Sequence, residues 1–424
     1  MVNLNTVLVP QRCWHGNGEF ALQFPSSWEL TTCYMQGHHK TPLSQAQIGA
    51  AFANPIGASR IRELAAGKKE VAILFDDMTR PTRAAELIPF VLEELGAASV
   101  PEEGIRFIAA LGAHGAMTRL DLSNKLGQAV VDRFLIYNHN PYENCTPLGK
   151  TSRGTPISIN TEVMNCELKI GIGCILPHPL TGFGGGGKII LPGVASVDTI
   201  ADNHSALPER TIAQGRDPAL GLGAFDENVV RLDTAEAAKM AGLDIKIDAV
   251  VNIRGETTAL FVGDPIDAHV EGVRLAKQVY ATEPVADNDI AVLNTYAKAS
   301  EAFLAPPLAT PLLREAGGDL VIVINAPEGQ VPHYLLRSFG KQLGGRLWFQ
   351  RTSLPPRVNR LIIFSPYIDR AGVDWIAPPE SVIWAKTWPE VLEELQASSG
   401  DRAKVAVVPD ATVQYFPERK EVPI

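Results

Sequence analysis

Short apolar segments of strand length alternate with segments of helical spacing along this chain, and this alternation narrows the fold more than any other feature. Residues 70–75 and 105–110 are nearly continuous apolar runs, and residues 84–95 between them have the spacing of an amphipathic helix. Strands that are apolar on both faces are typical of a parallel sheet covered by helices on both sides. The sequence therefore predicts an α/β fold with a mostly parallel sheet.

A polar stretch at residues 282–288 divides this alternation into two parts. A chain of 424 residues is long enough for two or three domains. We predict a large N-terminal α/β domain at 1–285 that binds the ligand, and a smaller Rossmann-like α/β domain at 286–424 that closes the cleft over it. In the second domain we expect strands at 290–293, 320–325, 361–364 and 404–409, and helices at 334–343 and 388–398.

A run of glycines at 182–187 precedes the single lysine Lys188. Such a run costs conformational entropy on folding and contributes little packing. It is favoured where the backbone must approach another group closely, most often a phosphate. We therefore predict that Lys188 and the glycines bind an anionic cofactor, the glycines concerned being Gly184, Gly185, Gly186 and Gly187.

A phosphate-binding P-loop is the nearest general motif, and it fits this run only in part. Gly182, Gly187 and Lys188 match its spacing, but Ile189 stands where a serine or threonine would bind Mg²⁺. Pro192 follows where the motif requires a growing helix. A nucleotide-binding hydrolase therefore remains an alternative, as does a non-catalytic carrier of a cofactor.

Histidines and charged residues gather around the ends of the predicted strands. His114 follows the strand at 105–110, and His178 and His204 stand on either side of the glycine run. Asp77 and Arg80 lie in the turn after the strand at 70–75, where open α/β sheets bind ligands. Histidine accepts and donates protons near neutral pH, which suits acid–base chemistry. Each residue alone could equally be a loop histidine or part of a solvated turn.

Several neighbouring residues are expected to have no functional role. Asp76, although adjacent to Asp77, is interpreted as part of a solvated turn. The remaining histidines are expected to be structural or exposed, and these are His15, His38, His39, His139, His269 and His333.

Composition argues against several classes of protein. The net charge is −9 without any block rich in lysine and arginine, which argues against nucleic acid as a partner. No apolar run approaches the length of about 20 residues that spans a membrane. The first residues lack the basic and apolar regions of a signal peptide, and the five cysteines form no Cys-x-x-Cys pair. These features predict a cytoplasmic protein whose partner is neither nucleic acid nor a membrane.

Four motifs in one order resemble the nickel-dependent lactate racemase family. They are Asp77-x-Thr-Arg80-Pro81, Gly112-Ala-His114, His178-Pro-Leu-Thr-Gly-Phe-Gly-Gly-Gly-Gly-Lys188 and Asn203-His204-Ser205. The resemblance covers most of the chain, is strongest over 54–270 and is weak after 290. Members of that family bind a nickel-pincer nucleotide, pyridinium-3-thioamide-5-thiocarboxylic acid mononucleotide, which holds Ni²⁺ between two sulfur-containing arms and a ring carbon.

The resemblance implies a role for each matching residue. Lys188 would hold the cofactor covalently through a thioamide, and His204 would be the protein ligand to nickel. Asp77 and Arg80 would bind the cofactor and help to orient the substrate. Enzymes that synthesise the cofactor would be partners of this protein.

The resemblance also implies the reaction, which is racemisation or epimerisation of a 2-hydroxy acid. Of the two acid/bases, His114 and His178, one would take the hydroxyl proton and the other would supply a proton on the opposite face. Between these steps the C2 hydride would move to the cofactor and return. The cofactor carries the difficult chemistry in such an enzyme, and the protein supplies placement and electrostatics.

One segment departs from the family pattern. Lactate-specific members have a glutamine and a lysine three residues apart early in the second domain, and 294–307 contains no such pair. Tyr296 and Lys298 could bind substrate from different positions, and Trp348 could line the pocket. We therefore expect a 2-hydroxy acid or sugar acid other than lactate.

Overall fold

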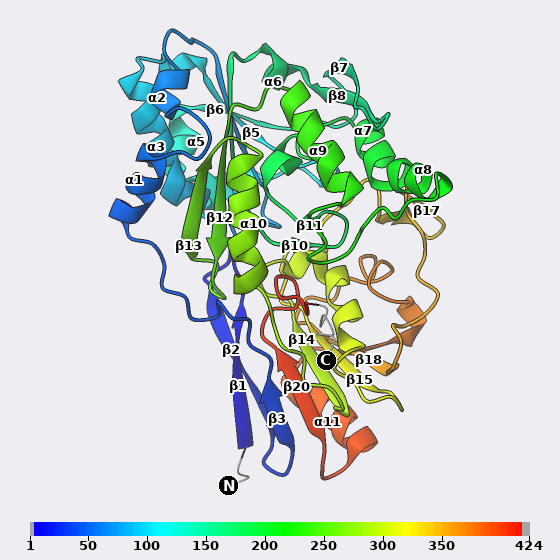
Figure 1. Ribbon diagram of the computed structural model, residues 1–424. Helices are drawn as coiled ribbons and strands as arrows, with labels where there is room; N and C mark the ends of the chain where they lie inside the picture. The colour runs from blue at the N-terminus through cyan, green and yellow to red at the C-terminus, as the bar shows by residue number, and fades with distance from the viewer. Residues whose placement is uncertain (1–3, 418–424) are drawn as a thin grey trace, which may run out of the picture. The chain divides into compact units, whose positions relative to one another are not determined.

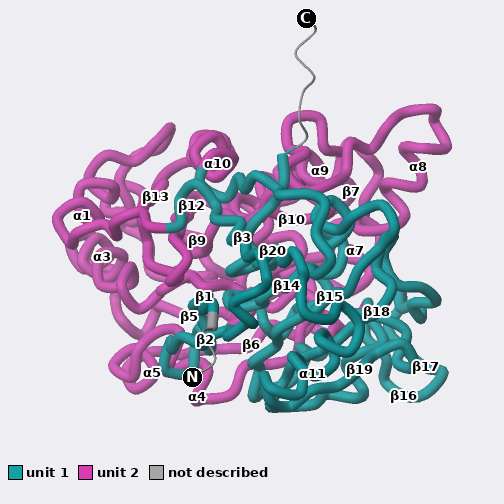
Figure 2. The backbone as a smooth tube through the Cα atoms, turned by 90° about the horizontal axis from the view of Figure 1, so that it is seen from below, with its two compact units in different colours: residues 1–38, 279–332, 336–424 teal, residues 39–278, 333–335 magenta. Residues whose placement is uncertain are grey.

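The computed structural model describes residues 4–417, and the chain divides into two compact units. Unit 1 contains residues 1–38, 279–332 and 336–424, and unit 2 contains residues 39–278 and 333–335 (Figure 2). Each unit is built on its own six-stranded sheet. No helix within residues 4–417 is both long and apolar enough to cross a bilayer.

The sheet of unit 2 has the strand order β13-β12-β9-β4-β5-β6 (Figure 1). All neighbours in it are parallel except β12 and β13, which are antiparallel. The strands are β4 (Val71–Phe75), β5 (Ile105–Ala109), β6 (Leu135–Asn138), β9 (Leu168–Cys174), β12 (Ile245–Val251) and β13 (Thr257–Gly263). Every residue of β4, β9 and β12 is buried, as expected for strands covered on both faces.

Helices and short hairpins connect these strands. Thr118 caps α4, as its position before an amphipathic segment predicts, because its Oγ1 accepts the N–H of Asp121 at 3.2 Å. The helices are α1 (Gln45–Ala53), α2 (Ile61–Leu64), α3 (Ala84–Ala97), α4 (Arg119–Leu126), α5 (Gln128–Arg133), α6 (Thr161–Asn165), α7 (Val197–Ala201), α8 (Leu207–Ala213), α9 (Val229–Met240) and α10 (Asp267–Val279). The hairpins are β7 (Cys145–Lys150) with β8 (Pro156–Asn160), and β10 (Pro177–His178) with β11 (Gly182–Phe183).

The sheet of unit 1 is parallel throughout and has the order β19-β18-β15-β14-β20-β3. Its strands are β3 (Glu29–Thr32), β14 (Ile290–Asn294), β15 (Gly318–Val323), β18 (Val358–Phe364), β19 (Val382–Ala385) and β20 (Lys404–Val408). The hairpin of β1 (Leu4–Gln11) and β2 (Gly18–Pro25) packs on one face together with α11 (Trp388–Ser399). The short 3-10 helices η4 (Ala299–Leu304) and η5 (Pro306–Ala309) pack on the other face.

Two predictions about this part of the chain are wrong. The N-terminal segment was expected in the first domain, but residues 29–32 form β3 and pair in parallel with β20, so residues 1–38 belong to unit 1. The helix expected at 334–343 is replaced by β16 (Ser338–Gly340) and β17 (Leu343–Gly344). Glycine at positions 340, 344 and 345 lowers helix stability and favours this tight antiparallel turn.

Candidate functional site

The carboxyl ends of three neighbouring strands of unit 2 gather the predicted residues at one edge of its sheet. β9, β4 and β5 are parallel neighbours, so the chain leaves all three at the same edge. Asp77 follows β4, His114 follows β5, and His178 and Lys188 follow β9. The N–H of Gly112 donates to the carbonyl of Gly193 at 2.8 Å, which joins the loop of His114 to the end of the glycine segment.

His114 and Asp77 form a hydrogen-bonded pair. Nδ1 of His114 lies 2.5 Å from Oδ2 of Asp77, and the two side chains are only 12% and 9% exposed. The other carboxylate oxygen accepts the N–H of Thr79 at 2.9 Å and its hydroxyl at 2.5 Å. Burial raises the pKa of Asp77, but His114, the charge of Arg80 and the bond from Thr79 together hold that pKa below its usual value. Asp77 is therefore ionised at neutral pH and accepts Nδ1–H, so the neutral form of His114 has its lone pair on Nε2.

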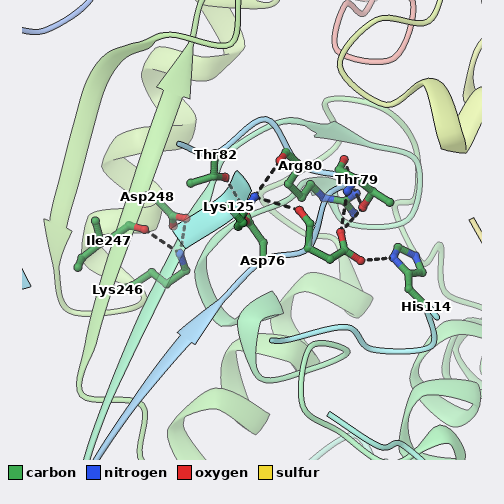
Figure 3. A network of polar contacts seen from close by, with 10 residues as sticks. Asp76, Thr79, Arg80, Thr82, His114, Lys125, Lys246, Ile247 and Asp248 are labelled. Carbon is green, nitrogen blue, oxygen red and sulfur yellow. Dashed lines mark hydrogen bonds and ion pairs between the residues drawn. The ribbon is translucent and has the colours of Figure 1, made fainter. Parts of the chain in front are cut away.

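A buried lysine supports the turn that carries Asp77. Nζ of Lys125 lies 2.6 Å from Oδ1 of Asp76, and it donates to the carbonyls of Asp77 at 3.0 Å and Arg80 at 2.9 Å (Figure 3). The other oxygen of Asp76 accepts the hydroxyl of Thr82 at 2.5 Å. Lys125 is fully buried. Asp76 is therefore a structural anchor of the site, and its interpretation as part of a solvated turn is wrong.

A second buried ion pair holds the glycine loop. Lys246 and Asp248 both lie on β12, with Nζ 2.6 Å from Oδ1 of the carboxylate (Figure 3). Oδ2 of Asp248 accepts the N–H of Gly186 at 2.7 Å. Burial raises the pKa of Asp76, while the charges of Lys125 and Lys246 lower it, so the two ion pairs act on each other. The sequence contained a signal for this pair, because Lys246 and Asp248 interrupt an otherwise apolar strand. Charged residues are rarely buried without a partner.

Three glycines of the loop, Gly185, Gly186 and Gly187, pack too closely against the protein itself to carry a Cβ. A Cβ on Gly186 would lie 2.2 Å from Nδ1 of His269, and one on Gly187 would lie 2.8 Å from the carbonyl of Thr234. A Cβ on Gly185 would lie 2.9 Å from the side chain of Ile175. Close approach of the backbone is thus confirmed as the reason for the glycines, but here the neighbour is the chain itself.

The backbone donors of the loop are largely engaged within the protein. The N–H of Gly184 donates to the carbonyl of Leu176 at 2.7 Å, and that of Lys188 donates to the carbonyl of Gly185 at 3.2 Å. The N–H of Gly186 donates to the carboxylate of Asp248. The N–H groups of residues 184, 186 and 188 therefore bond within the protein and do not converge on a phosphate, as successive N–H groups do in a phosphate-binding nest. A four-residue 3-10 helix, η2 (Gly186–Ile189), follows in place of the α-helix of a P-loop. This geometry does not support the hydrolase alternative.

His204 lies in an uncommon stretch of helix beside the charge of Lys188. Residues Asp202–Ala206 form the π-helical turn η3 between α7 and α8, a geometry often found at functional sites. Asn203 donates its Nδ2 to Asp233 at 2.8 Å, so its Oδ1 accepts Nδ1–H of His204 at 3.0 Å. Burial lowers the pKa of His204 to about 3, and the charge of Lys188 contributes to the lowering. His204 is therefore neutral at pH 7, with its lone pair on Nε2.

His178 has the opposite tautomer to His114. It pairs with Gly182 across the β10–β11 hairpin. Its Nδ1 accepts the N–H of Leu180 at 3.2 Å and that of Thr181 at 3.4 Å. Because a backbone N–H can only donate, the lone pair of neutral His178 is on Nδ1 and the proton is on Nε2.

The residues predicted to bind substrate from the second domain lie in unit 1, whereas the four residues Lys188, His114, His178 and His204 lie in unit 2. The hydroxyl of Tyr296 bonds to Asn17, and Nε1 of Trp348 donates to Asp374 at 3.3 Å. Lys298 lies 2.7 Å from Glu301 in a buried ion pair. Binding of substrate by Lys298 would require this pair to open.

His333, which was expected to be structural or exposed, lies beside His114. It forms an antiparallel bridge with His114, and the two ring centroids are 5.0 Å apart at an angle of 65°. No local pattern indicated this contact, because the two histidines are far apart in the sequence. A contact of that kind depends on the tertiary structure alone.

The side chains at this site have the chemistry to bind a metal only if a cofactor supplies most of its ligands. Within residues 4–417, no group of three or more His, Cys, Asp or Glu side chains could hold a metal ion. A neutral His204, oriented through Asn203 and presenting Nε2, has the chemistry of one metal ligand. The protein groups therefore fit a metal whose other ligands belong to a cofactor held beside Lys188.

The sequence of the chain is similar to those of lactate racemases. Residues 15–215 match the family described as "Lactate racemase N-terminal domain". The lactate racemase of Lactiplantibacillus plantarum is 27% identical over 394 residues, which are 88% of this chain and 91% of that protein. The lactate racemase of Thermoanaerobacterium thermosaccharolyticum is 29% identical over 246 residues, which are 57% of this chain and 56% of that protein.

Solved structures share the fold over almost the full length. The lactate racemase apoprotein from Thermoanaerobacterium thermosaccharolyticum has a TM-score of 0.71 at 20% identity and covers 98% of this chain and 100% of its own. A protein from Thermotoga maritima has a TM-score of 0.64 at 17% identity, with 89% and 100% covered. The match over residues 15–215 and the two sequence relatives show that the chain is similar to lactate racemases, and the apoprotein structure shows that it shares their fold.

Proposed function

We propose that this protein is an isomerase that racemises or epimerises a 2-hydroxy acid with a nickel-pincer nucleotide attached to Lys188. Its sequence relatives are named lactate racemases, and their chemistry needs a proton acceptor and a proton donor at one substrate. The observation that carries the proposal is the different bonding of the two Nδ1 atoms, with Asp77 at His114 and two backbone N–H groups at His178. In the neutral rings this bonding leaves an acceptor at Nε2 of His114 and a donor at Nε2 of His178.

The residues around the glycine loop would hold the cofactor. Lys188 would carry it covalently, and Nε2 of His204 would bind Ni²⁺. Asp77, Arg80 and the backbone of Gly184–Gly187 would surround the nucleotide. When bound, the cofactor would supply the acceptor that takes the C2 hydride and gives it back.

His114 would take the hydroxyl proton of the substrate on Nε2. The carboxylate of Asp77 would stabilise the imidazolium that forms, because it already accepts Nδ1–H. On the opposite face of the substrate, His178 would donate a hydrogen bond from Nε2–H to the same oxygen. Its Nδ1 must gain a proton before Nε2 can give one up, and this requires release from the N–H groups of Leu180 and Thr181. The two histidines would therefore contribute unequally to the two directions of the reaction.

Production of the protein together with the cofactor-synthesis enzymes tests the proposal. We expect intact-mass analysis to show a nucleotide-sized adduct on Lys188, with bound nickel, and we expect the loaded protein to lower the optical purity of a chiral 2-hydroxy acid. Lys188→Arg keeps the charge but cannot form the thioamide, so it should carry no adduct. Loaded protein that leaves every acid of a broad panel optically pure would end the proposal.

A further inference from the structure

Residues 333–335 join unit 2 although the chain on both sides of them belongs to unit 1. Beside the bridge of His333 with His114, the N–H of Tyr334 donates to the carbonyl of Ala113 at 2.7 Å. The rings of Tyr334 and Tyr142 meet edge to face with centroids 5.5 Å apart. These contacts hold the segment against the loop that carries His114. Residues directly opposite in an antiparallel pair project their side chains to the same face, so the two imidazoles are neighbours.

The two neighbouring imidazoles present different groups. Nδ1 of His333 accepts the N–H of Leu335 at 3.3 Å, so its proton in the neutral form is on Nε2. Nδ1–H of His114 donates to Asp77, so its Nε2 is an acceptor. A donor and an acceptor therefore lie side by side. A 2-hydroxy acid presents the complementary pair, a hydroxyl donor next to a carboxylate acceptor.

The carboxylate of such a substrate needs a donor from this protein. Lys298, which could bind substrate from the second domain, is engaged in the buried ion pair with Glu301. One arm of Arg80 already donates to Thr79, with Nη1 3.1 Å from its carbonyl and 2.7 Å from its hydroxyl. His333 offers a donor immediately beside the residue that takes the hydroxyl proton.

From the paired imidazoles we infer that His333 binds the substrate at this site, donating Nε2–H to its carboxylate while His114 exchanges a proton with the adjacent hydroxyl. The inference rests on the proposed function and extends it to a residue outside the four family motifs. It also explains how a chain without the Gln-x-x-Lys pair binds a carboxylate substrate.

Two substitutions separate hydrogen bonding from packing. His333→Phe keeps a planar ring against His114 but removes the donor, and His333→Gln keeps a donor without the ring. In cofactor-loaded protein we expect His333→Phe to raise KM by about tenfold, the effect of one hydrogen bond to a charged group, with a smaller change in kcat. We expect His333→Gln to keep KM within about threefold of the wild-type value. A wild-type KM in His333→Phe for every acid that the protein converts would overturn the inference.

A second measurement needs no turnover. In cofactor-free protein with ¹⁵N-labelled histidine, we expect the ring signals to report Nε2–H for His333 and Nδ1–H for His114. Oxalate, a planar mimic of a 2-oxo acid, should shift the Nε2 signal of His333. The buried ring of His139, whose Nε2 bonds to Ala195 at 2.9 Å, reports whether each variant is folded. A proton on Nδ1 of His333, or an unchanged His333 signal with oxalate, would contradict the inference.

The two experiments also distinguish failure of the inference from failure of the proposed function. Loaded wild-type protein that converts no acid would remove the proposed function, and the NMR measurement would still test the donor on His333. Loaded protein that is active, with an unchanged KM in His333→Phe, would remove only the role of His333.

Discussion

Asp77 accepts the Nδ1–H of His114 across 2.5 Å, and this bond decides which nitrogen of the neutral imidazole carries the proton. Asp77→Asn keeps the shape but replaces the carboxylate with an amide that can favour the wrong tautomer. We expect kcat of the loaded protein to fall on the order of 100-fold or more, as for other carboxylate–imidazole pairs. Nickel and cofactor content should be measured beside the rate. A variant that is fully loaded and retains kcat within about threefold would show that the carboxylate does not set the tautomer.

His114→Ala and His178→Ala distinguish an enzyme from a carrier of the cofactor. Under the proposed function both substitutions remove a ring nitrogen that exchanges a proton with the substrate, so we expect each to lower kcat by on the order of 100-fold or more. The adduct on Lys188 should remain, and intact-mass analysis measures it. If either variant turned over substrate at the wild-type rate, that histidine would have no part in proton transfer.

Gly186→Ala and Gly184→Ala form a matched pair that tests why the loop contains glycine. A Cβ at Gly186 would lie 2.2 Å from His269 and its φ is +53°, whereas the nearest contact of a Cβ at Gly184 is an ordinary 3.6 Å. We expect Gly186→Ala to lower the free energy of unfolding by about 2 kcal/mol or more, and Gly184→Ala to change it little. Urea denaturation measures both. Equal destabilisation by the two variants would contradict the packing explanation.

Lys125→Met tests the buried ion pair under the site. The substitution leaves the carboxylate of Asp76 buried without its cation, so we expect a loss of about 3–5 kcal/mol in the free energy of unfolding. Adding Asp76→Asn to the same chain removes the uncompensated charge and should restore part of that loss. Chemical denaturation measures both variants. A loss of less than about 1 kcal/mol for Lys125→Met alone would contradict a stabilising role for the ion pair.

His139 gives a pH dependence of stability that is independent of the cofactor. Burial lowers the pKa of His139 to about 4, against about 6.5 in the unfolded chain, while its bond to Ala195 opposes this shift. Between these two values the unfolded chain binds the extra proton, so the free energy of unfolding falls as pH drops from about 6.5 to about 4, by about 3 kcal/mol in total. His139→Gln should flatten this slope. An unchanged slope in the variant would exclude His139 as its source.

The sequence by itself determined the features that depend on single segments. Apolar strands such as 71–75 and 105–109 were recognisable because periodicity reports burial along one piece of chain. The cap at Thr118 follows from helix-end chemistry within a few residues. The spacing from His178 to Lys188 and His204 indicated the family that the comparisons support.

Only the tertiary structure decided the contacts between segments that are distant in the sequence. β3 joins the sheet of unit 1, Lys125 reaches Asp76, and His333 lies against His114. These contacts depend on strand order and on where loops return, and periodicity within one segment carries no information about either. The charge and tautomer of each site residue depend on the same neighbours, because burial and hydrogen-bond partners together set which atom holds the proton.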